Sequence, residues 1–173
     1  MNLYDSFKNK LEVGQRIECA VRDQLQKLLP DCTVFVTRQD DPIERFKYNL
    51  VDVVVQKDGH TILGIECKRG NTKLKSCWSM NGWSGVWNTP INRSSWKEYQ
   101  KAFFPVYVIN LQEFAHKVFV ADVPTIKNSK FGLDMFVQGR WVHNIDSRGW
   151  TRYEDDVTLS VILMDILKKE GIC

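Results

Sequence analysis

The sequence YNLVDVVVQKDGHTILGIECK, residues 48–68, decides the fold of this 173-residue chain. Residues 48–56 and 61–68 are rich in β-branched and other apolar side chains, which favour β-strands. Asp58-Gly59 lies between the two runs, and this dipeptide is typical of the tight turn of a β-hairpin. We therefore expect two antiparallel strands joined by a short turn.

Three ionisable side chains of this hairpin stand where the pattern calls for apolar or neutral residues. Residues i and i+2 of a strand point to the same face, so Glu66 and Lys68 converge on one spot. Asp52 stands among valines in the other strand, and burying an unpaired carboxylate costs several kcal/mol. Such carboxylates are retained when they pair with a cation or bind a metal. Oxygen ligands of this kind suit Mg²⁺, and an ion pair with Lys68 is the alternative interpretation.

The register of the hairpin decides whether its two carboxylates share a face. Directly opposed residues of an antiparallel pair lie on the same face of the sheet. A two-residue Asp58-Gly59 turn pairs Lys57 with His60, and a regular continuation of that register places the carboxylates on opposite faces. A shared site therefore requires a three-residue loop that pairs Gln56 with His60, or a β-bulge in one strand.

The rest of the chain predicts an α/β architecture. Helices and strands interleave around the hairpin, which is typical of a mixed sheet flanked by helices. The apolar stripe of the first helix passes close to Glu18, which lies on the inward face or at its margin. A turn is expected at Asp40-Asp41-Pro42, and Asp155 or Asp156 is expected to cap the last helix, which ends before Gly171. We expect other helices over 11–29 and 95–102, further strands over 33–37, 104–111 and 116–123, and short strands within 131–150.

Composition bounds the class of protein. Hydrophobic residues make up 43% and charged residues 26% of the chain, as in globular domains. The longest apolar runs fall far short of the ~18 residues that cross a bilayer, and no secretory pattern is present, so a cytoplasmic protein without a membrane span is expected. The 5 cysteines lack metal-site spacing, so free thiols are expected. We expect one domain over 1–173, with a core over about 11–123 and a C-terminal extension over 124–173 whose apolar helix packs on the core or on a second subunit.

A basic window follows the hairpin. Residues 67–101 carry seven basic side chains against one acid, a net charge of +6, whereas the whole chain carries only +3. Most of the tryptophans lie in the same window, where aromatic faces beside cations either stack on bases or fill the core. The residues expected to contact nucleic acid are Arg69, Lys73, Lys75, Trp83, Arg93 and Lys97. A solvated lysine-rich loop is the alternative interpretation.

The order of these acidic and basic residues is similar to that of a known superfamily. Asp52, then Glu66-Cys67-Lys68 on a hairpin, with Glu18 on a preceding helix, resembles the PD-(D/E)xK nuclease core shared by many restriction enzymes and archaeal-type Holliday junction resolvases. A valine replaces the proline of the motif. The resemblance implies a restriction-endonuclease-like core in which Asp52, Glu66 and the backbone carbonyl of Cys67 bind Mg²⁺, with Mn²⁺ able to substitute. It also implies that Lys68 assists the attacking water and that Glu18 holds a metal-bound water.

The function implied by this resemblance is Mg²⁺-dependent hydrolysis of DNA phosphodiester bonds by an endonuclease. A Holliday junction resolvase, acting in DNA recombination or repair, fits the small size, and the C-terminal helix could supply the interface of a homodimer. A restriction- or repair-type nuclease is the nearest rival. A non-catalytic nucleic-acid-binding module with the same fold, and a structural dimer whose acids only form salt bridges, are the alternatives from other classes.

Overall fold

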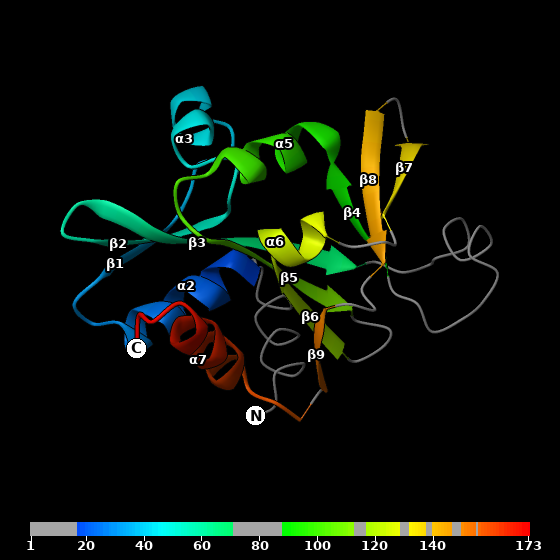
Figure 1. Ribbon diagram of the computed structural model, residues 1–173. Coiled ribbons are helices and arrows are strands. Elements are labelled where there is room, and N and C mark those ends of the chain that lie inside the picture. Colours follow the sequence, from blue (N-terminus) through cyan, green and yellow to red (C-terminus); the bar gives the residue numbers. More distant parts are fainter. Residues whose placement is uncertain are drawn as a thin grey trace.

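A mixed six-stranded sheet is the centre of the fold (Figure 1). The computed structural model describes residues 17–70, 88–112, 117–128, 132–137, 140–146, 150–154 and 156–173. The strands of this sheet are β1 (Thr33–Val36), β2 (Val53–Lys57), β3 (His60–Gly70), β5 (Val106–Gln112), β6 (Lys117–Asp122) and β9 (Thr151–Glu154). They lie in the order β1-β2-β3-β5-β6-β9. β3 and β5 run parallel and the other neighbouring strands run antiparallel, which confirms the expected mixed sheet flanked by helices.

The remaining elements are five helices and a second, smaller sheet within the described ranges. The small sheet has the strand order β4-β8-β7, with both pairs antiparallel. Its strands are β4 (Asn88–Asn92), β7 (Gly132–Val137) and β8 (Arg140–Asp146). The helices are α2 (Ile17–Leu28), α3 (Pro42–Lys47), α5 (Arg93–Lys101), α6 (Val123–Lys127) and α7 (Leu159–Lys169).

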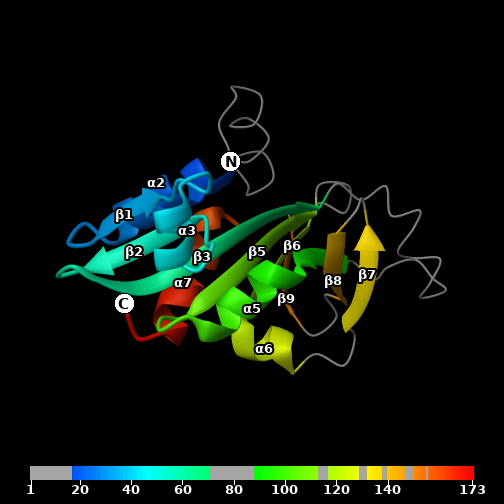
Figure 2. The ribbon, with the colours of Figure 1, turned by 90° about the horizontal axis from the view of Figure 1, so that it is seen from above.

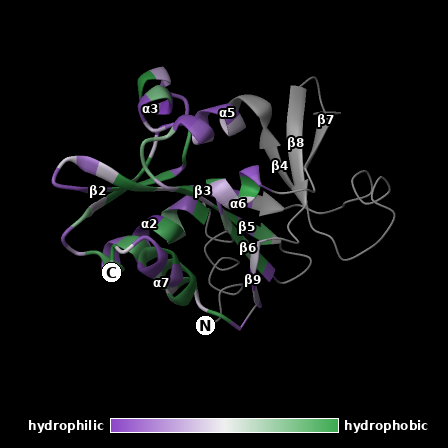
Figure 3. Cartoon of the chain, viewed as in Figure 1, coloured by the Kyte–Doolittle hydropathy of each residue, from purple (hydrophilic) through white to green (hydrophobic). Residues whose placement is uncertain are grey.

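Helices cover both faces of the main sheet, because its central strands present apolar residues on both sides. In β2, Val53 and Val55 enter the hydrophobic cluster that α2 and α7 complete, whereas Val54 enters the cluster beneath α5 and α6. Figure 2 shows α3, α5 and α6 together on one side of the sheet. The hydropathy colouring in Figure 3 agrees with this burial, because the central strands are hydrophobic and the β2–β3 turn is hydrophilic. Each face of the sheet is therefore a separate layer of core.

The last helix confirms the expected apolar face and corrects the expected cap. Its buried residues lie three and one apart, the spacing of a helix side packed on a core: Leu159, Ile162, Leu163, Ile166 and Leu167. Thr158 is the N-cap, because its hydroxyl accepts a hydrogen bond from the Val161 amide, so Asp156 is not the cap, and Asp155 lies outside the described residues. At the other end, Gly171 takes the left-handed conformation with φ 68°. Ile172 N donates to Leu167 O at 2.9 Å, which closes a Schellman motif.

This burial also corrects the expected role of α7 in a dimer. The apolar face of α7 packs on α2 and the sheet of the same chain, so that face is not exposed for a second subunit. The C-terminal segment also supplies a strand of the main sheet, because β9 pairs with β6. Residues beyond 123 therefore contribute to the same core as the hairpin.

Two further boundaries differ from the sequence-based expectation. The expected turn is present, since the Asp41 amide donates to Arg38 O at 2.9 Å, but it leads into a helix: the Asp41 carboxylate accepts hydrogen bonds from the amides of Ile43 and Glu44 and caps α3, with Pro42 at the first helical position. The strand expected over 48–56 consequently begins only at Val53. The helix expected over 95–102 begins earlier, at Arg93. No helix among the described residues is long and apolar enough to cross a membrane.

Candidate active site

A β-bulge sets the register of the β2–β3 hairpin. The turn is a two-residue one that pairs Lys57 with His60, with Asp58 and Gly59 at φ 51° and 78°, as a type I′ turn requires. Gln56 pairs with Thr61, but the next pair is Val55 with Leu63, so β3 carries one extra residue. The bulge that a shared site requires is therefore present.

The shifted register brings the two carboxylates of the hairpin to one face. Val53 lies opposite Ile65, and the preceding residue, Asp52, therefore reaches the position opposite Glu66. The Asp52 amide donates to Ile65 O at 3.1 Å, and the Asp52 carboxylate accepts from the Cys67 amide at 2.8 Å. Asp52 is thus anchored directly beside Glu66.

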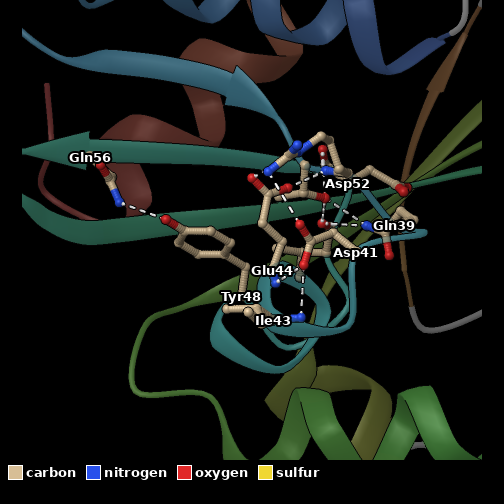
Figure 4. A network of polar contacts seen from close by, with 10 residues as sticks. Gln39, Asp41, Ile43, Glu44, Tyr48, Asp52 and Gln56 are labelled. Atoms are coloured by element: carbon tan, nitrogen blue, oxygen red, sulfur yellow. Dashed lines mark hydrogen bonds and ion pairs between the residues drawn. The ribbon is translucent and has the colours of Figure 1, made fainter.

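The chain before Asp52 is held in a sharp turn. After α3, Asn49 and Leu50 both take positive φ values, 53° and 60°, which are uncommon for residues other than glycine. The segment that follows β1 fixes the turn, because Thr37 Oγ1 and Gln39 Nε2 both donate to Val51 O, at 2.5 and 2.6 Å. Figure 4 shows this network around Asp52 and the start of α3. Three segments therefore position the backbone that carries Asp52: α3 before it, the residues that follow β1, and β3, whose Ile65 carbonyl accepts from the Asp52 amide.

Glu66 and Lys68 form an ion pair on the same face. Lys68 Nζ lies 2.7 Å from Glu66 Oε1. Glu66 is 5% exposed, and its second oxygen, Oε2, is buried without a hydrogen-bond partner. The Tyr99 hydroxyl of α5 is buried beside this carboxylate and also lacks a hydrogen bond of good geometry. One oxygen of Glu66 is therefore paired and the other remains available to a ligand.

Burial raises the pKa values of both carboxyl groups. Desolvation, followed by the charge of Glu66, raises the pKa of Asp52 from 3.8 to about 8. Desolvation likewise raises the pKa of Glu66, although Lys68 opposes the shift. For Lys68, desolvation alone would lower the pKa, but the Glu66 carboxylate more than compensates and raises it. Two carboxyl groups therefore face a single lysine, and ionising both without a further cation is unfavourable.

Glu18 lies within electrostatic range of this cluster. It occupies the first turn of α2 and is half-buried. Its charge contributes to the raised pKa values of both Asp52 and Cys67, so the structure brings it near the hairpin as expected. The Cys67 side chain packs toward the α2 and α7 face, away from Glu66 and Lys68, and burial raises the pKa of its thiol. The proposed role of the Cys67 carbonyl as a ligand stays a prediction.

The oxygen donors present fit a hard divalent cation. Asp52 and Glu66 offer carboxylate oxygens on one face, and Glu66 Oε2 is a buried acceptor without a partner. Mg²⁺ binds one or two carboxylates and keeps several waters, so a two-carboxylate site is sufficient for it. Among the described residues, no three His, Cys, Asp or Glu side chains lie together in the manner of an all-protein metal site.

The expected nucleic-acid contacts are only partly within the described residues. Lys97 is exposed on α5, the helix that covers the face of the sheet carrying Glu66 and Lys68. Arg93 is the first residue of α5, and Arg69 follows Lys68 in β3. The other expected contacts lie outside the described residues: Lys73, Lys75 and Trp83.

Tyr99 is the site neighbour that sequence reasoning missed. It lies three residues after Trp96 on α5, and this spacing alone indicates an inward-facing aromatic pair. Which strand such a residue meets depends on the crossover from β3 to β5, a contact over more than thirty residues. Helical periodicity could therefore have found its burial but not its proximity to Glu66.

Comparison with known proteins supports the fold. No protein-family description matches the sequence, and no curated protein does. Among solved structures, the chain is similar to D212, a nuclease from a fusselovirus, with a TM-score of 0.50 and 15% sequence identity. The match covers 93% of this chain and 92% of that one. The chain therefore has a mixed six-stranded sheet with flanking helices similar to that of a known nuclease structure.

Proposed function

We propose that this protein is a Mg²⁺-dependent nuclease that hydrolyses phosphodiester bonds of DNA. The observation that carries the proposal is the bulged hairpin, which places Asp52, Glu66 and Lys68 on one face. A similar overall fold in a fusselovirus nuclease supports the proposal. In metal-dependent phosphodiester hydrolysis, carboxylates hold a divalent cation, and nearby positive charge stabilises the charge that develops in the transition state.

The charge balance of the site argues against a purely structural salt bridge. Asp52, Glu66 and Lys68 leave an excess of negative charge when ionised, and Glu18 increases it. A buried ion pair that only stabilised the fold would be balanced, since an uncompensated buried charge costs several kcal/mol. The excess negative charge favours a divalent cation as the missing partner.

The chain's own residues have separate roles in this proposal. Asp52 and Glu66 would hold the cation, with the Cys67 carbonyl as a further ligand, and Mn²⁺ would substitute for Mg²⁺. A bound cation of this kind polarises the phosphate and offsets the charge that develops during the reaction. Lys68 has a raised pKa and stays protonated, so it orients the attacking water as a hydrogen-bond donor rather than as a base. Glu18 would position a water at the edge of the site.

The proposed substrate is DNA, and a branched junction is the form of DNA that we propose. Lys97 and Arg93 of α5, and Arg69, which follows Lys68 in β3, would neutralise phosphates beside the site. A Holliday junction resolvase acts on two symmetric strands and would work as a homodimer. The interface of such a dimer would lie outside the apolar face of α7, which is buried within the chain.

Cleavage assays on matched substrates test the proposed activity. The protein is incubated with linear duplex, single-stranded and four-way-junction DNA of the same sequences, and with a matched RNA, in Mg²⁺, Mn²⁺ or EDTA. We expect cleavage in Mg²⁺ and Mn²⁺ and none in EDTA. Preference for the junction would support a resolvase, whereas equal cleavage of linear duplex would favour a restriction- or repair-type nuclease. Binding of DNA without cleavage in either metal would contradict the nuclease proposal.

A further inference from the structure

A buried hydrogen-bond donor and a buried acceptor are neighbours beneath α5. The Tyr99 hydroxyl can donate a hydrogen bond, and Glu66 Oε2 can accept one. Both atoms are buried and neither has a hydrogen-bond partner in the structure. Tyr99 is 2% exposed and Glu66 is 5% exposed, so water does not readily supply the missing bonds. Leaving two complementary groups unpaired in a core is costly, and natural structures rarely retain such pairs without a function.

The surroundings of Tyr99 do not explain its hydroxyl. The ring packs in the cluster formed by α5, α6 and the sheet, with neighbours that include Val54, Val108 and Phe119. A phenylalanine would fill the same space and leave no orphaned oxygen. The hydroxyl lies close enough to Glu66 that each group affects the pKa of the other. The polar side chains beside the hydroxyl are Glu66 and Ser95, and of these Glu66 carries a buried oxygen without a partner.

Glu66 needs an orienting partner if it is to serve as a ligand. Its Oε1 atom pairs with Lys68 at 2.7 Å. This single contact holds one oxygen of the carboxylate and leaves the position of the other oxygen unrestrained. Carboxylates that bind metals are usually hydrogen-bonded by a neighbouring side chain, which fixes their orientation. The described groups that face Glu66 are Asp52, Lys68 and Tyr99. Asp52 loses its proton when it acts as a ligand, so Tyr99 is the neutral donor that remains beside Glu66 when a cation is bound.

We propose that Tyr99 is a positioning residue that donates a hydrogen bond to Glu66 Oε2 and holds this carboxylate in the orientation that binds a divalent cation. The inference rests on the proposed function for its effect on cleavage. The bond joins neighbouring groups, because the hydroxyl lies beside the carboxylate. Tyr99 acts through Glu66 and does not itself contact substrate.

The test compares Tyr99→Phe with Tyr48→Phe. Tyr48 belongs to the same cluster and is 7% exposed, but its hydroxyl faces Gln56 rather than the site (Figure 4). Each substitution removes one oxygen and keeps the ring. Mn²⁺ affinity is measured by isothermal titration calorimetry without DNA, and kcat and KM are measured on the DNA that the wild-type chain cleaves.

We expect Tyr99→Phe to weaken Mn²⁺ binding by about 10-fold or more and to lower kcat by a similar factor, with the KM for DNA unchanged. Tyr48→Phe should change neither quantity. Thermal unfolding of the metal-free protein should show that Tyr99→Phe stays folded, so that a loss of Mn²⁺ affinity reports on the site. Wild-type Mn²⁺ affinity in Tyr99→Phe would overturn the inference.

Failure of the proposed nuclease activity gives a different pattern. If the wild-type chain binds Mn²⁺ but cleaves no DNA, the nuclease proposal fails and the calorimetric comparison still decides the role of Tyr99. If the wild-type chain cleaves DNA and Tyr99→Phe binds Mn²⁺ and cleaves equally well, the function stands and Tyr99 is only a core residue. Absence of Mn²⁺ binding by the wild-type chain overturns both proposals.

Discussion

Asp52 is held in place at a cost to the metal-free fold. Its carboxyl is buried beside Glu66, and the two residues that lead toward it, Asn49 and Leu50, have positive φ values. Non-glycine residues in this conformation cost on the order of 1 kcal/mol or more each, and they persist where the surrounding structure enforces them. Hydrogen bonds from Thr37 and Gln39 to the Val51 carbonyl supply that enforcement. Such strain and buried charge are typical of a site whose partner is a ligand.

The raised pKa of Asp52 predicts how stability depends on pH. The folded-state pKa, about 8, exceeds the ordinary value of 3.8, so between these values the folded chain binds more protons than the unfolded chain. The free energy of unfolding should therefore fall as pH rises from 5 to 8, by on the order of a few kcal/mol. Urea denaturation in EDTA at pH 5 and pH 8 measures the fall.

Asp52→Asn is the matched control, because it keeps the shape of the side chain and removes its titration. This variant should lose most of the pH dependence and become more stable than the wild-type chain at pH 8. Adding Mg²⁺ should restore stability at pH 8 in the wild-type chain alone. A wild-type chain whose stability rises from pH 5 to pH 8 in EDTA would contradict the assigned burial of Asp52.

Substitutions at Lys68 and Glu66 distinguish a residue that acts in catalysis from one that binds the metal. Lys68→Ala should abolish cleavage, since it removes the donor proposed to orient water, while Mn²⁺ still binds at Asp52 and Glu66. Glu66→Gln should abolish cleavage together with Mn²⁺ binding, and Glu18→Gln should reduce cleavage less than either. Cleavage rates and calorimetric Mn²⁺ titrations of the three variants make the comparison. Wild-type cleavage in Lys68→Ala would remove this lysine from the mechanism.

At the scale of the elements, the bulge in β3 is what allows the site to exist. The preference of Asp58-Gly59 for a two-residue turn and the need for opposed carboxylates give incompatible registers unless one extra residue is inserted. The sequence predicts this conflict, because turn type and strand period are both local properties. It does not predict which of the two solutions occurs, since the bulge is selected by how the strands pack in the sheet. The structure places the extra residue between the pairs of Val55 and Gln56.

Other elements were predictable only in part, for physical reasons that differ. The apolar face of α7 has strict helical spacing, and its helix is as expected. By contrast, α3 has six residues and buries none of them, so no periodicity marks it and only the Asp41-Pro42 cap could have indicated a helix. The pairing of β9 with β6 joins residues far apart in sequence, which no local pattern specifies. The candidate acids were found because each violates the apolar pattern of its strand or helix.

Gly64 couples the β3–β5 pair to the segment before Asp52. A Cβ atom at this position would lie 2.7 Å from the Phe104 ring and 3.1 Å from Val51 Cγ2. Gly64→Ala should therefore cost about 1–3 kcal/mol of stability and also reduce cleavage, since Val51 precedes Asp52. Urea denaturation and the cleavage rate measure the two effects.

Gly171→Ala gives the control for this substitution. Its φ of 68° strains an alanine, but no atom lies within 4 Å of the added Cβ and the residue follows α7, on the opposite side of the sheet from α5. This variant should lose about 1 kcal/mol of stability and keep the wild-type cleavage rate. Equal cleavage in the two variants would show that Gly64 does not influence the site.

At the scale of the whole molecule, one face of the main sheet is mainly structural and the other carries the candidate site. The α2 and α7 side is a closed apolar core, whereas Glu66, Lys68 and Tyr99 share the side covered by α5. Lys97 is exposed on that covering helix. Bound DNA is therefore expected to approach from the side of α5.

Salt dependence tests this direction of approach. DNA binding measured in Ca²⁺ should weaken as salt rises, and Lys97→Gln should make the slope of log K against log salt shallower by about one unit. Lys168→Gln is the control, because Lys168 is exposed on α7 across the sheet, and its slope should match that of the wild-type chain. Fluorescence anisotropy of a labelled duplex gives both slopes. A larger change in Lys168→Gln than in Lys97→Gln would place the DNA on the other side.

Asp52 and Glu66 are proposed to share one divalent cation, and a crystal structure of the protein grown with Mn²⁺ tests this proposal. We predict an anomalous scattering peak between the two carboxylates, with an oxygen of each at about 2–2.6 Å, and Glu66 Oε2 hydrogen-bonded to Tyr99. Asp52→Asn crystals should lack the peak. A structure with Mn²⁺ bound elsewhere, and with Glu66 still paired only to Lys68, would contradict the account.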